Sequence, residues 1–466
     1  MKQDPSLTQN DSTQSSTTQS PTLIRTMGLW ALVIYGVGDM LGSGIYALIG
    51  KVAGKMGNAA WLAFVVSMVA ALLTGLSYAS VGSRYPRAAG VAYVAHRAFR
   101  IPFLSYLVGL AVIASGLTSF AVQSRAFSSY FLGMIGFAPT EISQTAQIAV
   151  VLSFIAALTF INFWGIREST WLNIVCTFVE VSGLMIIIGI GISYWGTVNY
   201  LEIPPPADTT NGMGGITSTL LLQGAVLTFY SFVGFEDMIN VTEEVKNPRK
   251  NFPIAVIVAL AITTIIYIAV SISAVSVVPY GELNASGQPL VEVVKKAAPG
   301  FPSGLFSLIA LFAITNTGLL NYIMGSRLVY GMARYGFVPK RLGAIHRVRR
   351  TPHNAIMFLM GVVIVLALSG DISQLASATS ALLLVVFTIV NASLIMLKRQ
   401  KSEPKGYFEV PYFVPAAAIV ACAVMLFHAK PGALLTAMVL IAAITLLYFL
   451  NRPKNITEDA LIETGM

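Results

Sequence analysis

The chain has little charge for its length, and this scarcity decides the class of protein. Of its 466 residues only 11% are charged, whereas 56% are hydrophobic. A water-soluble domain of ordinary composition devotes about 25% of its residues to charged side chains. The surface of this protein is therefore predicted to face lipid over most of its area.

Cysteine and histidine are also scarce, which argues against disulfide bonds, metal binding and histidine-based catalysis. The two cysteines, Cys176 and Cys422, both lie within apolar stretches and are expected to be packing residues rather than a disulfide. The four histidines fall at predicted loops or helix ends, and no metalloprotease, hydrolase or phosphate-loop motif is present. We therefore predict no enzyme, no catalytic residues, no cofactor and no metal site.

The hydrophobic residues are gathered into long stretches, such as Ala60 to Leu76 and Ile254 to Val278. About twelve such stretches can be drawn, each long enough to cross roughly 30 Å of hydrocarbon. The alternating pattern of a membrane barrel is missing, so the backbone must satisfy its polar groups within helices. The predicted fold class is an all-α integral membrane protein with about 12 transmembrane helices.

The excess of basic residues is distributed in a way that predicts topology. They occupy every second predicted loop: Arg84, Arg87, Arg97 and Arg100; Arg167; Lys246, Arg249 and Lys250; Arg334, Lys340, Arg341, Arg347, Arg349 and Arg350; Lys398, Arg399, Lys401 and Lys405. Basic loops remain in the cytoplasm, so both termini are predicted to be cytoplasmic in a multi-pass protein of the plasma (inner) membrane. This dispersed pattern does not indicate a nucleic-acid partner.

Two of the predicted spans are interrupted by glycine and acidic residues, at 35–46 and at 229–238. The interruptions lie about 190 residues apart, and the same offset relates most other spans of the two halves, which predicts inverted repeats. We expect helices 1 and 6 to be broken. The predicted division is a tail at 1–22, repeats at 23–200 and 213–400, two extra helices within 408–451 and a tail at 452–466.

Matched breaks in inverted halves predict a substrate site at the middle of the membrane. The alternative is that the glycines only pack helices closely, since Gly38 and Gly42 also form a small-xxx-small pair. Polar residues on two other helices favour a lined cavity: Asn173, Thr177 and Glu180 share one helical face, and Ser115, Thr118, Ser119 and Gln123 form a stripe with Arg125 just beyond.

Five segments of the chain carry a resemblance to a known family. They are the first span from Gly28-Leu29-Trp30 to Gly42-Ser43-Gly44-Ile45-Tyr46, the turn Arg84-Tyr85-Pro86-Arg87-Ala88-Ala89-Gly90, Gly234-Phe235-Glu236 with Glu243-Glu244-Val245-Lys246-Asn247-Pro248-Arg249, Gly325 to Arg334, and Thr351-Pro352-His353-Asn354-Ala355. In this order they resemble the amino acid/polyamine/organocation transporter superfamily. The resemblance implies a permease with the inverted-repeat fold also seen in bacterial leucine transporters.

A broken helix can hold an amino acid zwitterion without charged side chains. Backbone N–H groups freed at Gly42-Ser43-Gly44 would bind the carboxylate at a helix N-terminus. Freed carbonyls in both breaks would accept from the ammonium group, and Phe232 would cover the substrate as an aromatic lid or serve as an ordinary packing residue. The predicted substrate-binding residues are Met40, Leu41, Gly42, Ser43, Gly44, Tyr230, Ser231, Phe232, Val233 and Gly234.

Four acidic residues lie at predicted membrane depth, where an ionised carboxylate is costly: Asp39, Glu180, Glu236 and Asp237. We predict that they couple transport to protons. Several proton-coupled relatives carry a lysine in helix five, where this sequence has Glu180, so the coupling chemistry cannot simply be carried over. An alternative for Glu180 is a structural ion pair with Arg125 or Arg327.

The predicted function is secondary active transport of amino acids, as proton-coupled symport by alternating access. The partners are then an amino acid or amine substrate, protons and membrane lipid, and the protein is expected to be a monomer. Two alternatives stay open. One is a polyamine or cationic amino acid exchanger, and the other is an amino acid sensor of the same fold that does not transport.

Overall fold

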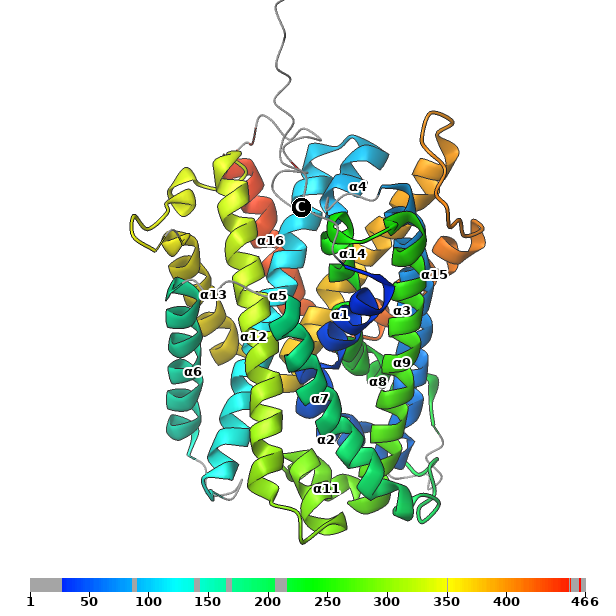
Figure 1. Ribbon diagram of the computed structural model, residues 1–466, viewed down its shortest axis with the longest axis vertical. Helices are drawn as coiled ribbons and strands as arrows, with labels where there is room; N and C mark the ends of the chain where they lie inside the picture. The colour runs from blue at the N-terminus through cyan, green and yellow to red at the C-terminus, as the bar shows by residue number, and fades with distance from the viewer. Residues whose placement is uncertain are drawn as a thin grey trace, which may run out of the picture.

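The computed structural model describes residues 27–85, 90–137, 143–164, 170–205, 216–349 and 351–451, with 453 and 461. The regular secondary structure of this part of the chain is helical, apart from one isolated bridge between Met27 and Val245. The all-helical prediction is therefore confirmed (Figure 1). The predicted tail at 1–22, the turn 86–89, and Arg167 lie outside the described residues, as does nearly all of 452–466.

Nine helical segments of the described residues are long and apolar enough to cross a membrane, and three shorter apolar helices accompany them. The main helices are α1 (Leu29–Leu41), α2 (Ser43–Met56), α3 (Ala60–Arg84), α5 (Pro102–Met134), α6 (Gln144–Trp164), α7 (Thr170–Gly191), α8 (Ser218–Phe229), α9 (Pro248–Val277), α12 (Ser303–Arg334), α13 (His353–Ser369), α14 (Ile372–Arg399), α15 (Phe413–Phe427) and α16 (Pro431–Asn451). The chain is thus a multi-span membrane protein.

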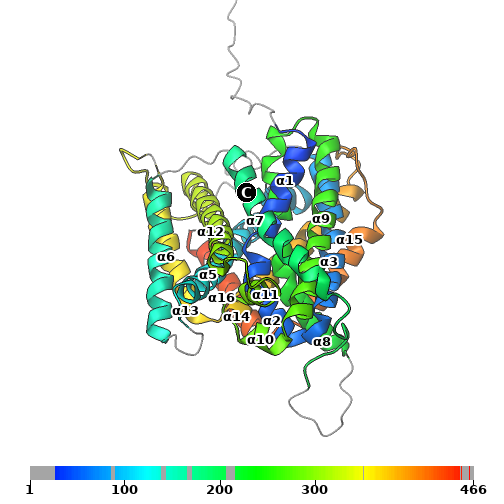
Figure 2. The same ribbon diagram turned by 60° about the horizontal axis from the view of Figure 1, so that its bottom comes forward.

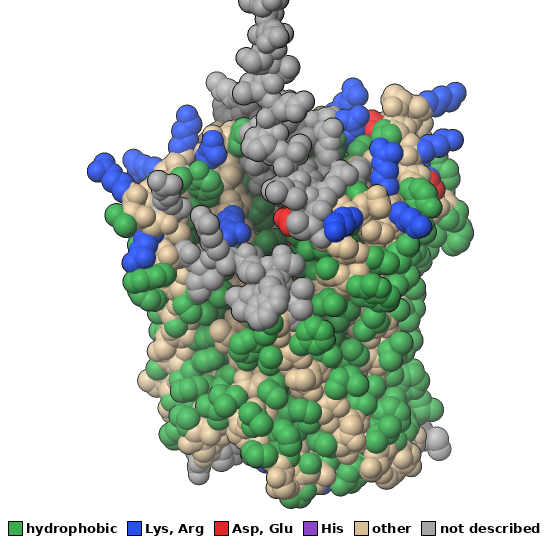
Figure 3. Space-filling model, in the orientation of Figure 1, with side chains coloured by type: hydrophobic (Ala, Val, Ile, Leu, Met, Phe, Trp, Pro, Cys, Tyr) green, Lys and Arg blue, Asp and Glu red, His purple; other side chains and the backbone are tan. Residues whose placement is uncertain are grey.

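Large apolar side chains cover the outside of this bundle. Ile265 on α9, Val365 on α13 and Leu450 on α16 are each more than two-thirds exposed, which in water would be unfavourable. The space-filling view shows hydrophobic side chains covering the middle and lower parts of the visible surface (Figure 3). These faces are suited to hydrocarbon, as the composition predicts.

Basic side chains gather at one end of the molecule, the upper end of Figure 3. The exposed Arg341, Arg347 and Arg349 follow α12, and the exposed Lys401 and Lys405 follow α14. The short helix α4 (Val91–Phe99) lies at this basic end, while the short helices α10 (Tyr280–Ala285) and α11 (Pro289–Ala297) lie toward the other end (Figure 1, Figure 2). The two ends are called basic and distal below.

The first predicted break is confirmed, because α1 ends at Leu41, Gly42 leaves helical geometry and α2 begins at Ser43. The second is also confirmed. There α8 gives way to a 3-10 turn η3 (Tyr230–Phe232), then to Gly234 with a φ of 126°, and then to the 3-10 segment η4 (Phe235–Glu244). A positive φ of this size favours glycine, so the second break depends on this residue.

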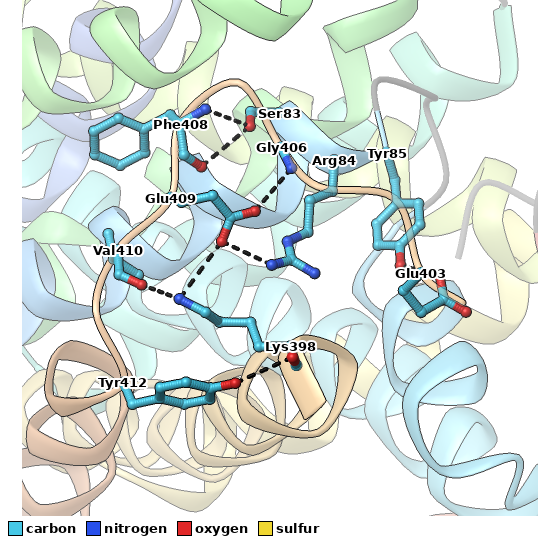
Figure 4. A network of polar contacts seen from close by, with 10 residues as sticks. All are labelled: Ser83, Arg84, Tyr85, Lys398, Glu403, Gly406, Phe408, Glu409, Val410 and Tyr412. Carbon is cyan, nitrogen blue, oxygen red and sulfur yellow. Dashed lines mark hydrogen bonds and ion pairs between the residues drawn. The ribbon is translucent and has the colours of Figure 1, made fainter. Parts of the chain in front are cut away.

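The loop between α14 and α15, residues 400–412, is fastened to the basic end of α3, and we call it the strap (Figure 4). Arg84, in the last turn of α3, donates to Glu409 at 2.7 Å, and Lys398 lies 3.5 Å from the same carboxylate oxygen. Arg97 of α4 and the Tyr85 hydroxyl both donate to Glu403. The strap therefore joins α3, α4 and α14 at one end of the bundle.

The strap carboxyl groups are held in the ionised form. Partial burial would raise the pKa of Glu409, but hydrogen bonds from Arg84 and the Gly406 N–H, with the charge of Lys398, lower it below its ordinary value. The pKa of Glu403 is likewise lowered, since Tyr85 and Arg97 outweigh burial. A carboxyl group whose pKa is lower in the folded than in the unfolded state stabilises the fold at pH values above its unfolded pKa. This stabilisation is lost as the pH falls through the pKa of the folded state.

Replacing the strap carboxylate Glu409 by glutamine should lower stability by about 1.5–3 kcal/mol near neutral pH, because the buried Arg84 loses its charged acceptor. The measurement is thermal unfolding in detergent from pH 7 to pH 3. The loss should shrink as the pH falls below the usual carboxyl range. Glu282→Gln, at an exposed pair 3.9 Å long, is the control and should change little. Equal stability of Glu409→Gln and the unmodified protein at pH 7 would contradict this role.

Candidate functional site

The two helix breaks lie against each other in the middle of the bundle. A Cβ atom on Gly44 would stand 2.9 Å from the Cα of Ser231, and one on Gly234 would stand 2.9 Å from the backbone of Asp39. Both distances are shorter than side chains allow, so glycine permits the two backbones to touch. Segments almost two hundred residues apart thus lie in direct contact at the two breaks.

A small central cavity lies at this junction. It is lined by Asp39, Met40, Ser43, Gly44, Ser119, Gln123, Tyr230, Val233, Gly234, Asp237, Thr317 and Asn321. Its volume of about 20 Å³ suits one water molecule rather than an amino acid. The breaks and the surrounding helices must therefore move apart to admit a substrate of that size.

Polar side chains from three helical segments converge on one atom of the central cavity, the Ser119 hydroxyl oxygen of α5. The Tyr230 hydroxyl lies 2.9 Å from it, Gln123 donates to it at 3.2 Å and Asn321 of α12 donates at 3.3 Å. The carbonyl oxygen of Gln123 has no partner among the described residues, although it is buried. A buried acceptor of this kind is available to a ligand that carries N–H groups.

The backbone N–H group of Ser43 points to the hydroxyl of Thr317 at 3.3 Å. It belongs to the first turn of α2, where N–H groups have no helical partners and the helix dipole favours an anion. The side chain of Thr317 also packs where a Cβ on Gly42 would stand, at 2.1 Å from its Oγ1 atom. In the part of the chain described, α12 therefore closes the site beside the first break.

The hydroxyl of Tyr267 on α9 contacts a backbone carbonyl of each break. It can donate to the carbonyl of Met40 or to that of Ser231, the latter at 2.6 Å. One hydroxyl has one hydrogen, so one of these carbonyls keeps its acceptor capacity. Phe232 is fully buried against Tyr267, with ring centroids 5.4 Å apart. Phe232 is not among the residues that line the central cavity, whereas Tyr230 is.

The model of the amino acid permease family matches residues 27–452. The chain belongs to the amino acid permease family. It is 30% identical over 95% of its length to a methylthioribose transporter of Bacillus subtilis, covering 96% of that protein.

Two further relatives are permeases with other substrates. A branched-chain amino acid permease of Bacillus subtilis is 25% identical over 95% of this chain and 96% of its own. The chloroplastic cationic amino acid transporter 9 of Arabidopsis thaliana is 30% identical over 71% of this chain and 58% of its own. The family consists of transporters, so the prediction that the chain is not an enzyme is confirmed.

Three of the four predicted acids of this permease surround the second break. Asp39 and Asp237 line the central cavity, and Glu236 accepts from the backbone N–H of Gly234 at 2.9 Å. Asp237 also accepts from Asn240 at 3.3 Å. Glu236 and Asp237 both line a second cavity that leads toward the basic end. These acids therefore stand between the central cavity and that end of the permease.

The fourth predicted acid, Glu180, lies on α7. It is fully buried, and its Oε1 atom accepts from Asn316 of α12 at 3.0 Å. Its Oε2 atom has no partner among the described residues, and no ion pair of Glu180 is found among them. The alternative of an ion pair with Arg125 or Arg327 thus finds no support; Arg125 donates instead to the Ala367 carbonyl at 2.6 Å. Asn173, predicted on the same face as Glu180, has a side chain outside the described residues.

Three cavities follow one another along α5. Gly109 to Ser119 line the cavity toward the basic end, Ser119 and Gln123 line the central cavity, and Arg125 to Ser129 line a cavity toward the distal end. The three cavities are therefore arranged in order along one helix, from the basic end of the permease to the distal end.

Three residues of the candidate site were not predicted from the sequence: Thr317 and Asn321, which line the central cavity, and Tyr267, whose hydroxyl contacts both breaks. Thr317 and Asn321 stand four residues apart in an apolar helix, so they share one face. That spacing could have indicated a polar face directed into the bundle. The sequence gave no such indication for Tyr267, because a single tyrosine in an apolar helix is ordinary.

Proposed function

We propose that this permease is a secondary active transporter of amino acids that works by alternating access. The observation that carries the proposal is the meeting of two broken helices at a polar cavity, inside a chain of the amino acid permease family. Helix N-terminal N–H groups at Ser43 and Gly44 suit a carboxylate, and carbonyls of Met40 and Ser231 suit an ammonium group. Every amino acid carries both groups.

The proposed topology counts α1 with α2, and α8 with η4, as single interrupted spans, which gives twelve spans in all. Two inverted repeats, at 23–200 and 213–400, would each begin with a broken helix, and α15 and α16 would follow as extra helices. The proposal places the basic end and both termini in the cytoplasm of a plasma (inner) membrane, supported by the gathering of Lys and Arg at that end.

We further propose that transport is coupled to protons and that Glu180 carries the proton. The support is geometric, since Glu180 is fully buried with one amide donor and one carboxylate oxygen that has no partner in the described part of the chain. An ionised carboxylate in such a place has no positive charge beside it to offset the cost of burial. The protonated carboxyl group is neutral, so it does not incur that cost. The Tyr46 hydroxyl donates to the Glu180 backbone carbonyl at 2.8 Å, which links this helix to the first break.

A second candidate substrate is a neutral methylthio sugar, because one relative that aligns over nearly the whole chain is a methylthioribose transporter. Such a sugar has no carboxylate and no ammonium, so it would use hydroxyl contacts to Ser119, Gln123 and Asn321 instead. The two candidates differ at the helix N-terminus at Ser43: an amino acid would place its carboxylate there, whereas the sugar has no carboxylate to place.

Ligand-induced thermal stabilisation of the purified protein should separate these candidates. The panel is the twenty amino acids, common polyamines and methylthioribose, each at pH 5.5 and pH 7.5. A ligand of the folded state stabilises it by about 2.7 kcal/mol at one hundred times its dissociation constant. We expect one or more amino acids to raise the melting temperature. A shift with methylthioribose or polyamines but with no amino acid would reject amino acid transport.

A further inference from the structure

The cavity at the distal end is larger than the central one and is lined by polar and charged side chains. Its volume is about 380 Å³, enough for a whole amino acid. α2 contributes Lys51, α5 contributes Arg125, and Asp371 stands immediately before α14. We call this the distal cavity. Nothing in the proposed central site uses any of its charges.

The charges of the distal cavity are unbalanced. Among its lining residues two are basic and one is acidic, and no ion pair joins them among the described residues. The Lys51 ammonium donates to the Asn284 carbonyl at 2.8 Å, and the Arg125 guanidinium donates to the Ala367 carbonyl at 2.6 Å. Each of these contacts uses one N–H of a group that has three or five, so donors remain for an anion.

The acidic residue of the distal cavity, Asp371, is placed to bind a positively charged group of a ligand. Asp371 caps α14, with its Oδ1 atom accepting from the backbone N–H of Gln374 at 2.7 Å. This contact fixes the carboxylate at the cavity wall, and its side chain remains exposed. A carboxylate has about four acceptor sites, so the cap leaves capacity for an ammonium group.

The distal cavity lies directly beyond the central cavity. α2 carries Ser43 and Gly44 in the central cavity and Lys51 in the distal one, roughly 12 Å farther along the helix at 1.5 Å per residue. Between them stand two buried tyrosines, where the Tyr130 hydroxyl donates to the Tyr46 carbonyl at 3.0 Å. A solute that enters from the distal end therefore meets Lys51 and Arg125 before it meets the broken helices.

We propose that the distal cavity is a second binding site, which takes a zwitterion by its carboxylate at Lys51 and Arg125 and by its ammonium at Asp371. The excess of positive charge repels polyamines, which have ammonium groups and no carboxylate. The substrate class is thereby narrowed to amino acids without a net positive charge. This proposal rests on the proposed transport of amino acids and adds a selecting step before the central site.

The test is uptake by cells that express the protein, corrected with an empty vector, for each labelled amino acid and for labelled putrescine. Lys51→Gln should raise KM for neutral amino acids about fivefold, as loss of one charge contact of roughly 1 kcal/mol predicts. It should leave kcat nearly unchanged, because the central site is intact. The rise in KM should be smaller at high salt, where exposed charges are screened. Lys51→Glu should raise KM further.

The control is Lys295→Gln on α11, an exposed lysine that pairs with Glu292 and does not line the cavity. It should leave KM unchanged. Unchanged KM in both Lys51→Gln and Lys51→Glu, or a lower KM for putrescine than for neutral amino acids in the unmodified protein, would overturn the distal site while leaving amino acid transport standing. Absence of uptake of every amino acid would overturn the proposed function and this inference together.

Discussion

Gly44→Val is expected to abolish substrate binding in protein that still inserts into the membrane. A Cβ atom at Gly44 would come within 2.9 Å of the Ser231 backbone, so the added side chain forces the two helix breaks apart. The N–H groups of the first turn of α2 would then no longer face the carbonyls of the second break. The measurement is the ligand-induced thermal shift of the purified variant at saturating amino acid.

Gly234→Leu should have the same effect for a different reason. Gly234 has a φ of 126°, which other residues rarely adopt, and its missing side chain leaves room for the backbone of Asp39. Gly361→Val, on the exposed face of α13 with no atom near its Cβ position, is the matched control and should keep full binding. If both break variants gave the thermal shift of the unmodified protein, the substrate site would lie elsewhere.

Glu180→Gln is expected to keep substrate binding and exchange but to lose accumulation driven by a pH gradient. Glutamine keeps the shape of the side chain and an acceptor for Asn316, and it cannot release a proton. With one proton per substrate, a gradient of one pH unit drives up to about tenfold accumulation. The variant should instead stop at an internal concentration equal to the external one, measured by labelled uptake into proteoliposomes.

The control for this variant is Glu292→Gln, a partly exposed acid on α11 that pairs with Lys295 at 3.0 Å. It should accumulate substrate as the unmodified protein does. Counterflow, in which unlabelled substrate inside exchanges for labelled substrate outside, should be normal in Glu180→Gln. Full gradient-driven accumulation by Glu180→Gln would remove this residue from the coupling step, and a strict sodium requirement of the unmodified protein would reject proton coupling.

The sequence predicts the parts of this fold that depend on local chemistry. Membrane helices follow from apolar stretches of sufficient length, and the first break follows from Gly42 and Gly44 in an otherwise apolar run. The second break follows from Gly234, which alone can take the backbone conformation found there. Both breaks could be located because they are caused by the residues that occupy them.

Contacts between distant segments could not be predicted in the same way. The pairing of Arg84 with Glu409 spans more than three hundred residues, and nothing in either neighbourhood specifies the other. Tyr267 reaches both breaks only because α9 packs against α1 in three dimensions. Phe232 illustrates the same limit, since its position in the sequence does not indicate that its ring packs against Tyr267 of α9.

The measurement that tests the central claim most directly is gradient-driven uptake by the unmodified protein in proteoliposomes. The labelled probes are the amino acids that stabilise the protein, with an external pH one unit below the internal pH and no sodium. The account predicts accumulation above the external concentration, which a protonophore collapses. Ligand binding with neither accumulation nor counterflow would contradict it and would identify a sensor with the fold of a transporter.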